Sequence, residues 1–212
     1  MRESALREEM AVLSKSLFDR GLTSGSTGNI SVATDDGWLM SPTGSSMGSL
    51  DPAAISKIDK AGTHIAGHAP TKEAFLHQAM FAARPKAGAI VHLHSTYSVA
   101  VSCLEGLNPK EVLPPLTPYF VMRIGKLGLV PYFPPGDVNL AKAVQECAMR
   151  HSAILLANHG PVVAGKSLKD AVYASEELEE TAKLFLVLQG LKTVPLKPEQ
   201  VSEIERRFPK EV

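Results

Sequence analysis

The sequence predicts one α/β domain, spanning residues 1–212, with a mixed central sheet. Helical and strand patterns alternate along the chain, and no repeat, low-complexity linker or break in composition divides it. Hairpin patterns near the N-terminus argue against a purely parallel, doubly wound sheet. A chain of this length can also enclose a substantial hydrophobic core.

Helices are expected where apolar side chains recur at spacings of three and four residues. These patterns cover residues 3–21, 69–85, 95–104, 137–150, 167–190 and a short stretch within 192–208. Strand patterns form a hairpin at 29–33 and 37–42, an extended pair within 56–67, and two buried runs at 87–95 and 152–160. The segment 113–137 is expected to contain no regular helix, because its prolines include two doublets.

Composition narrows the range of partners and compartments. Lys plus Arg equals Asp plus Glu, at 22 each, and no basic run occurs, so neither nucleic acid nor an anionic membrane is an expected partner. Cys103 and Cys147 form no CxxC pair, which favours a reducing compartment over a disulfide framework. The charged N-terminus and the lack of a long apolar run lead us to expect a cytoplasmic protein.

The clearest chemical pattern is His92-x-His94 within an apolar strand. Side chains two residues apart on a strand point the same way, so both imidazoles are aimed at one point. Such a pair is typical of a metal site. The alternative is two histidines that are hydrogen-bonded in the core or exposed on the surface.

Glu73 and His159 are further candidates, each with a simpler alternative. His159 follows a buried strand at the turn into Gly160, where α/β folds commonly present ligands, although a histidine can also just cap a turn. Glu73 lies at the start of its predicted helix, where carboxylates often only cap the helix. His77 shares a helix face with Glu73 and is either a supporting partner or a packed residue. Three imidazoles and a carboxylate suit Zn²⁺ or a similar ion such as Mn²⁺, but spacing alone does not bring them together.

The order of these motifs resembles the class II aldolase/adducin family. The resemblance rests on GLTSGSTGNIS, then SPTGSS, then PTKEAFLHQAMFAARPKAGAIVHLHSTYSVAVSCL, then LLANHGPVVAG, and runs over most of the chain. It implies a three-layer α/β/α domain with a largely antiparallel mixed sheet. It also implies a four-fold symmetric homotetramer with active sites between subunits.

The resemblance assigns roles to individual residues. It implies that Glu73, His92, His94 and His159 bind the divalent metal, with Glu73 also able to act as a base. It places a substrate phosphate among the residues Asn29, Thr43, Gly44, Thr71 and Lys72. It further suggests Tyr119 as a proton donor, although a tyrosine between prolines is more often a packing residue.

Lys72 sets this chain apart from many aldolases of the family. Where those read Ser-Ser-Glu, this chain reads Thr71-Lys72-Glu73, which adds a positive charge beside the metal site. The alternative is a solvated lysine at the start of a helix. Through this lysine and the segment 117–137, the chain resembles the family members that decarboxylate 3-oxo-tetronate 4-phosphate. Those members form dihydroxyacetone phosphate through an enediolate. Arg123 and Lys126 are further candidates for binding the anionic groups, but each is better explained as surface charge.

Three alternatives remain open. The first is a sugar-phosphate aldolase of the same family, which forms the same enediolate by retro-aldol cleavage. The second is a non-catalytic interaction module like that of adducin, which has no need of four metal ligands. The third is a histidine-based hydrolase, for which the sequence offers no convincing nucleophile because GxSxG is absent.

Overall fold

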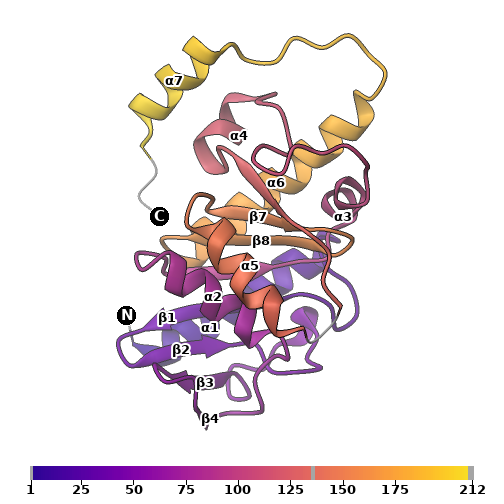
Figure 1. The fold of residues 1–212 in the computed structure, drawn as a ribbon. Coiled ribbons are helices and arrows are strands. Elements are labelled where there is room, and N and C mark those ends of the chain that lie inside the picture. The colour runs from indigo at the N-terminus through magenta and orange to yellow at the C-terminus, as the bar shows by residue number, and fades with distance from the viewer. Residues whose placement is uncertain (1, 135–136, 210–212) are drawn as a thin grey trace.

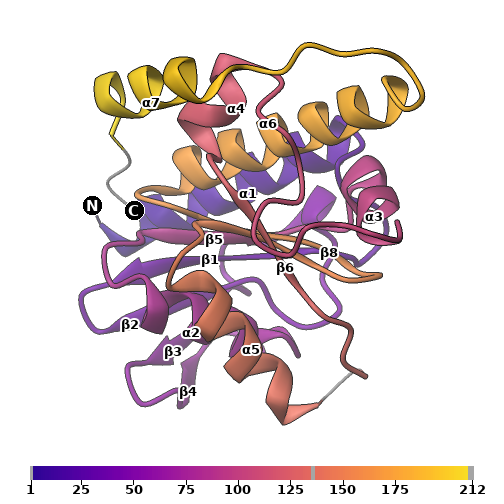
Figure 2. The same cartoon turned by 45° about the horizontal axis from the view of Figure 1, so that its top comes forward.

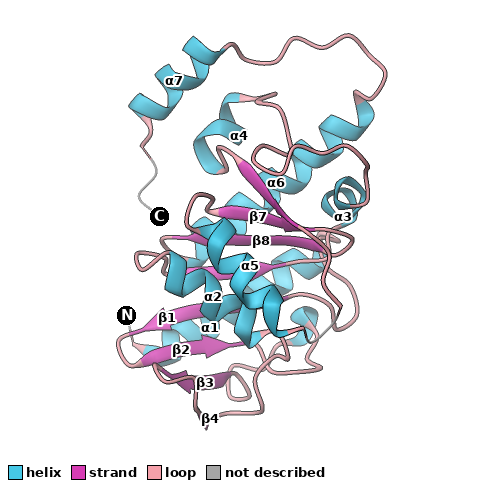
Figure 3. Ribbon diagram, in the orientation of Figure 1, coloured by secondary structure: helices cyan, strands magenta, loops and turns pink. Residues whose placement is uncertain are grey.

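A computed structural model describes residues 2–134 and 137–209, and its centre is one mixed eight-stranded sheet (Figures 1 and 3). The strand order is β4-β3-β2-β1-β5-β8-β7-β6, and all neighbours pair antiparallel except β6 and β7. The strands are β1 (Asn29–Thr34), β2 (Gly37–Met40), β3 (Ser56–Asp59), β4 (His64–Ala66), β5 (Ala89–His92), β6 (Leu127–Val130), β7 (Ala153–Leu156) and β8 (Gly160–Gly165). The largely antiparallel mixed sheet expected from the sequence is confirmed.

Helices cover both faces of this sheet, as Figure 2 shows. One face packs against α1 (Glu3–Asp19), α3 (Thr96–Ser102) and α6 (Leu168–Val187), and the other against α2 (Ala74–Ala83) and α5 (Val138–Ala148). Outside α6 lie α4 (Pro118–Arg123) and then α7 (Pro198–Arg207), while a 3-10 turn, η1 (Met47–Ser49), packs on α1. The three-layer α/β/α arrangement therefore holds.

Successive side chains of the central strands point to opposite faces of the sheet, so each face carries an apolar layer. In β5, Ile90 packs in the cluster with α2 and α5, while its neighbour Val91 packs in the cluster with α1 and α6. Both side chains are fully buried, and burial of an aliphatic side chain of this size contributes about 1.5–3 kcal/mol. The apolar run that predicted a buried strand is thus explained by contacts on both faces.

Two expectations from the sequence were wrong in detail. The segment 113–137 does contain a helix, α4, which begins at Pro118. Proline is tolerated at the first helical position because its missing N–H has no partner inside the helix, and Thr117 caps the turn by accepting from Phe120 N at 3.1 Å. The two proline doublets lie before and after α4 in the sequence and do not interrupt it. The strands β6 and β8 were also missed, since glycine and proline in LGLV and GPVVAG weaken the strand pattern.

The sheet register brings the ends of three strands together. In the antiparallel pair of β1 and β5, Asn29 lies opposite His92, and in the pair of β5 and β8, His92 lies opposite Val162. The start of β1, the end of β5 and the start of β8 therefore meet at one edge. Within the part of the chain that is described, no helix has the length and apolarity needed to cross a membrane.

Candidate metal centre and active site

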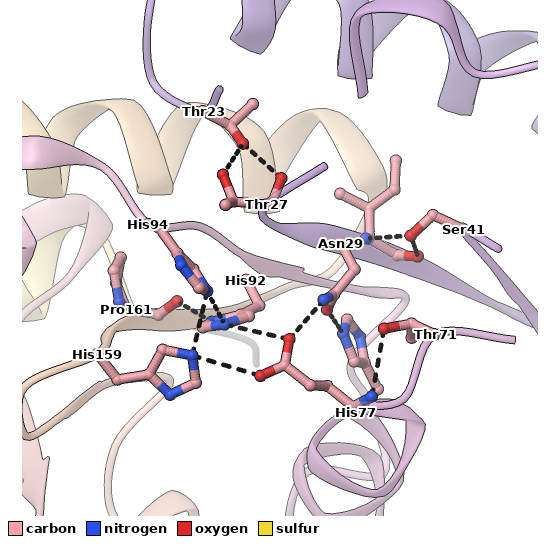
Figure 4. Close-up of polar contacts among 12 residues, drawn as sticks. Thr23, Thr27, Asn29, Ser41, Thr71, His77, His92, His94, His159 and Pro161 are labelled. Atoms are coloured by element: carbon pink, nitrogen blue, oxygen red, sulfur yellow. Dashed lines mark hydrogen bonds and ion pairs between the residues drawn. The ribbon is translucent and has the colours of Figure 1, made fainter. Parts of the chain in front are cut away.

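Four side chains from three regions meet at this edge. His92 is the last residue of β5, His94 follows two residues later, and His159 ends the turn between β7 and β8. Glu73 takes the N-cap position immediately before α2, rather than a place within its first turn. Their ligand atoms all lie within 4.8 Å of one another, so the convergence that spacing alone left open is present (Figure 4).

The distances between these atoms fit one small divalent ion. His94 Nε2 lies 3.1 Å from both His92 Nε2 and His159 Nε2. Glu73 Oε2 lies 3.5 Å from His92 Nε2, and Glu73 Oε1 lies 3.3 Å from His159 Nε2. Ligands around a tetrahedral Zn²⁺ with bonds of about 2.0–2.1 Å are separated by about 3.3–3.4 Å. The chain therefore presents a three-imidazole, one-carboxylate donor set with the spacing that such an ion requires.

The hydrogen bond on the far side of His92 prepares its ring for this role. Pro161 O lies 2.8 Å from His92 Nδ1, and a carbonyl only accepts, so Nδ1–H donates to it. The neutral ring then carries its lone pair on Nε2, which faces the other ligands (Figure 4). Complete burial lowers the pKa of His92 to about 4, which keeps the ring neutral at physiological pH. Burial also lowers the pKa of His94, and the neighbouring His159 lowers it further.

Glu73 is held as a carboxylate by its surroundings. Burial alone would raise its pKa, but His92, the hydrogen bond from Asn29, and the other two histidines together outweigh that effect and lower it. Asn29 Nδ2 donates to Glu73 Oε2 at 2.7 Å. The side chain of Glu73 is 25% exposed whereas that of His92 is fully buried, so the carboxylate faces the open side of the cluster.

The sequence Asn158-His159-Gly160 shapes the tight approach of β8 to β5. A Cβ on Gly160 would lie 2.3 Å from Leu93 O and 3.5 Å from His94 Cα, so only glycine fits against this backbone. Asn158 has a φ of 56°, a left-handed conformation that asparagine tolerates better than most residues. His159 is therefore directed at His94 by backbone constraints on both of its neighbours.

Beside the cluster lies a pocket of about 780 Å³ lined by polar loops. The pocket is lined by residues 26–29, 42–45, 71–73 and 156–159, with Phe75, His94, Leu140 and 131–133 completing it. Backbone hydrogen bonds from Thr43 N to Ala69 O and from Thr71 N to Ser41 O, at 2.9 and 3.1 Å, join the second and third loops. All five residues expected to bind phosphate therefore line one pocket with Glu73.

Two features of these loops bear on anion binding. Gly28 has a φ of 75° and passes close to the site, since a Cβ there would lie 3.0 Å from His92 O. Lys72 is exposed at the pocket wall, and none of the residues in the described ranges forms an ion pair with it. The pocket therefore offers a positive charge to an incoming anion.

Tyr119, Arg123 and Lys126 lie elsewhere in the chain. Tyr119 is on α4 and 61% exposed, and together with Arg123 it lines a separate, smaller pocket between α4 and the start of α6. Arg123 also lies over the ring of Tyr173, with 5.7 Å to the centroid. Lys126 is 3.9 Å from Glu111. Within one chain, none of the three lines the pocket beside Glu73.

The structure also adds residues that motif analysis did not assign to the site. Phe75, Tyr132 and Phe133 form an apolar wall of the pocket, which no local sequence pattern marks as functional. His77 is fully buried and hydrogen-bonded to Asn29, which makes it a partner of the site rather than a merely packed histidine.

Comparisons with known proteins place the chain in a family. The model of the Class II Aldolase and Adducin N-terminal domain matches residues 8–186. A 3-oxo-tetronate 4-phosphate decarboxylase from Escherichia coli O6:H1 is 50% identical over 187 residues, 88% of each chain. A solved Klebsiella pneumoniae structure of the aldolase/epimerase/decarboxylase type has a TM-score of 0.94 at 45% identity, covering 96% of this chain and 99% of that one.

A more distant relative represents the aldolases. An L-fuculose phosphate aldolase from Methanococcus maripaludis is 35% identical over 184 residues, covering 87% of this chain and 98% of that protein. The family match extends over most of the chain, and the four clustered side chains are the ones that the resemblance assigned to the metal. The chain belongs to the class II aldolase and adducin family.

Proposed function

We propose that this protein is a metal-dependent lyase that decarboxylates 3-oxo-tetronate 4-phosphate to dihydroxyacetone phosphate and CO₂. The observation that carries the proposal is the clustering of Glu73, His92, His94 and His159 beside a polar pocket that holds Lys72. The 50% identity to a decarboxylase of this substrate supports the choice of reaction. In the reaction the bond between the carboxylate carbon and its neighbour breaks, and the electron pair remains on the substrate as an enediolate. A proton delivered to the carbon that lost CO₂ completes the product.

The four clustered side chains are proposed to hold Zn²⁺ or another divalent ion such as Mn²⁺. The bound ion supplies Lewis acidity for the negative charge that develops on the substrate oxygens, worth on the order of several kcal/mol. Burial keeps His92 neutral, and the hydrogen bond to Pro161 places its proton on Nδ1, while Asn29 and the histidines keep Glu73 ionised. These contacts organise the donor set before a substrate arrives.

The polar loops are proposed to bind the anionic groups of the substrate. Thr43, Gly44 and Thr71 lie on two loops joined by backbone hydrogen bonds, and Asn29 begins β1 beside them. Lys72 adds a full positive charge at the same wall, which favours a substrate with two anionic groups over one with a single phosphate.

Glu73 is the proposed relay of the proton to the enediolate carbon, because its carboxylate faces the pocket and belongs to the cluster. It takes up a proton from solvent, passes it to that carbon and returns to the carboxylate form. Tyr119 lies on another surface of the same chain, so it can serve as donor only from a neighbouring copy. From the family resemblance we propose a homotetramer with sites between subunits, in which 1–212 forms one domain. A cytoplasmic location is part of the same proposal.

The second candidate is aldol cleavage of a phosphorylated ketose. The 35% identity to an L-fuculose phosphate aldolase favours it, and the same donor set would support the shared enediolate. The two reactions differ in the leaving group, which is CO₂ in one case and an aldehyde in the other. The positive charge of Lys72 favours the carboxylated substrate.

The test is to supply the Zn²⁺- or Mn²⁺-loaded protein with 3-oxo-tetronate 4-phosphate and with L-fuculose 1-phosphate in parallel. CO₂ release and dihydroxyacetone phosphate formation from the first substrate, with little cleavage of the second, is the expected result. Aldehyde release from the second substrate without CO₂ from the first would replace the decarboxylase with the aldolase. A chain that neither retains metal nor turns over either substrate would favour the non-catalytic module.

A further inference from the structure

His77 is a buried histidine whose two ring nitrogens both have partners on β1. Ser31 Oγ lies 2.6 Å from His77 Nδ1, and Asn29 Oδ1 is hydrogen-bonded to His77 Nε2. Asn29 and Ser31 are two residues apart on the strand, so their side chains face α2 together. Figure 4 shows His77 beside Asn29. The ring does not line the pocket, but Asn29 does.

Hydrogen bonds link Glu73 to Asn29, Asn29 to His77, and His77 to Ser31 in one series. The direction of this series follows from the carboxylate of Glu73, which can only accept. Because Glu73 Oε2 only accepts, the group of Asn29 that faces it at 2.7 Å must be the NH₂. Asn29 Oδ1 then faces His77 and only accepts, so His77 Nε2–H donates to it. Burial lowers the pKa of His77 to about 3, so the ring is neutral and Nδ1 accepts from the hydroxyl of Ser31.

The opposite arrangement would place two acceptors against each other. A flipped Asn29 amide would direct Oδ1 at the carboxylate oxygen, an unfavourable contact in a largely buried site. A ring that donates from Nε2 prevents this flip, because it offers no acceptor to the NH₂ group. The tautomer of His77 therefore fixes which end of Asn29 meets Glu73.

The result is an asymmetric carboxylate. Oε2 is held by Asn29, while Oε1 lies on the side of His159, 3.3 Å from its Nε2, and His159 also lines the pocket. We propose that His77 is a positioning residue that orients the Asn29 amide, so that Oε2 of Glu73 stays anchored and Oε1 is presented for proton transfer. The role in proton transfer rests on the proposed function, whereas the orientation of Asn29 and Glu73 does not.

The first test reads the tautomer without any substrate. Long-range ¹⁵N–¹H spectra of histidine-labelled protein report which ring nitrogen carries the proton, and loss of the signals in His77→Gln assigns them. The expected proton is on Nε2. A proton on Nδ1 would reverse the series and overturn the proposal, whatever reaction the protein catalyses.

The second test uses variants that differ in the Nε2 donor. Leucine at position 77 removes the donor, while glutamine places an NH₂ group near the position of Nε2. We expect His77→Leu to weaken Zn²⁺ binding about 10-fold to 100-fold in chelator competition, the range for residues that orient metal ligands, and His77→Gln to stay within about 3-fold of wild type. With the decarboxylase substrate at saturating metal, kcat of the leucine variant should fall in the same range while KM stays nearly constant.

The matched control is Ser175→Ala, which removes a buried hydrogen bond to Ala171 O on α6, away from the pocket. It should lower thermal stability without changing metal affinity. Equal metal affinities for the glutamine and leucine variants would reduce His77 to a packing residue. If the leucine variant does not fold, the proposed role of His77 is still tested by two measurements. These are the tautomer of the wild-type ring and the Zn²⁺ affinity of the glutamine variant. If the wild type lacks decarboxylase activity, the proposed function fails while the tautomer and metal tests remain informative.

Discussion

Replacement of Gly160 by alanine is expected to damage the metal site without touching a ligand. The added Cβ would lie 2.3 Å from Leu93 O, so the two strands must separate by about 1.1 Å to restore an ordinary contact of 3.4 Å. No side-chain rotation can relieve a contact with backbone. The displacement falls on the residue before His94, whereas metal–ligand distances tolerate only about 0.2 Å.

The consequences can be estimated from that displacement. Overpacking of this kind costs about 1–3 kcal/mol of folding free energy, and a misplacement of about 1 Å can lower turnover about 100-fold. The assays are thermal unfolding of the metal-free protein and Zn²⁺ affinity by chelator competition. Both stability and affinity should fall in Gly160→Ala.

Gly88 provides a matched control at the other end of the β5–β8 strand pair. A Cβ there would lie 2.2 Å from Lys166 O, a comparable clash, but Gly88 precedes β5 whereas His92 ends it. Gly88→Ala should therefore lose similar stability and keep its Zn²⁺ affinity. Wild-type affinity in Gly160→Ala, or an equal loss of affinity in both variants, would refute the link between this backbone contact and the site.

The remaining predictions concern individual side chains. His94→Ala should abolish turnover and lower the metal content measured by elemental analysis, since one of four ligands is lost; unchanged turnover and content would contradict its role. Lys72→Ala should raise KM for the doubly anionic substrate about 10-fold with a smaller change in kcat, because a charge-assisted contact is worth about 1.5–3 kcal/mol, and unaltered constants would place Lys72 in solvent. The pKa of His77 is about 3 in the folded protein against an ordinary value of 6.5, so the unfolded chain binds the proton more readily. Neutral His77 therefore contributes to the free energy of unfolding fully above pH 6.5, and this contribution is lost as the pH falls toward 3. Urea unfolding of metal-free protein between pH 7 and 5 should show that loss, and a His77→Gln variant with the same pH dependence would argue against it. Glu179 accepts three hydrogen bonds at the N-terminus of α3, so Glu179→Ala should lower the melting temperature by several degrees, and an unchanged melting temperature would show that this cap contributes little.

The sequence predicted the local elements that have strong periodicity or clear end signals. The N-terminal hairpin, α2 and the buried run of β5 follow from alternation and from proline at helix ends. The elements that were missed, α4, β6 and β8, contain proline or glycine whose effect depends on position and on pairing with distant strands. Glu73 and His94 lie just outside the helix and strand expected to carry them, within the usual uncertainty of element ends.

The candidate site was predicted only in part, because local patterns are visible in the sequence and long-range contacts are not. His92 and His94 share a direction because they are two residues apart, a purely local property. Their meeting with Glu73 and His159 depends on β1, β5 and β8 being neighbours, which is a long-range arrangement that only the family resemblance indicated. The link from His77 to Asn29 depends on strand β1 passing under α2, so no local motif reveals it.

Glu73, His92, His94 and His159 are expected to bind one divalent ion. Crystals of the protein soaked with Zn²⁺, with data collected on both sides of the zinc absorption edge, test this directly. We expect one anomalous peak between the three Nε2 atoms and the Glu73 carboxylate, with ligand distances of about 2.0–2.2 Å. No peak there at saturating Zn²⁺, or a peak bound by other residues, would show that these four side chains do not form the metal site.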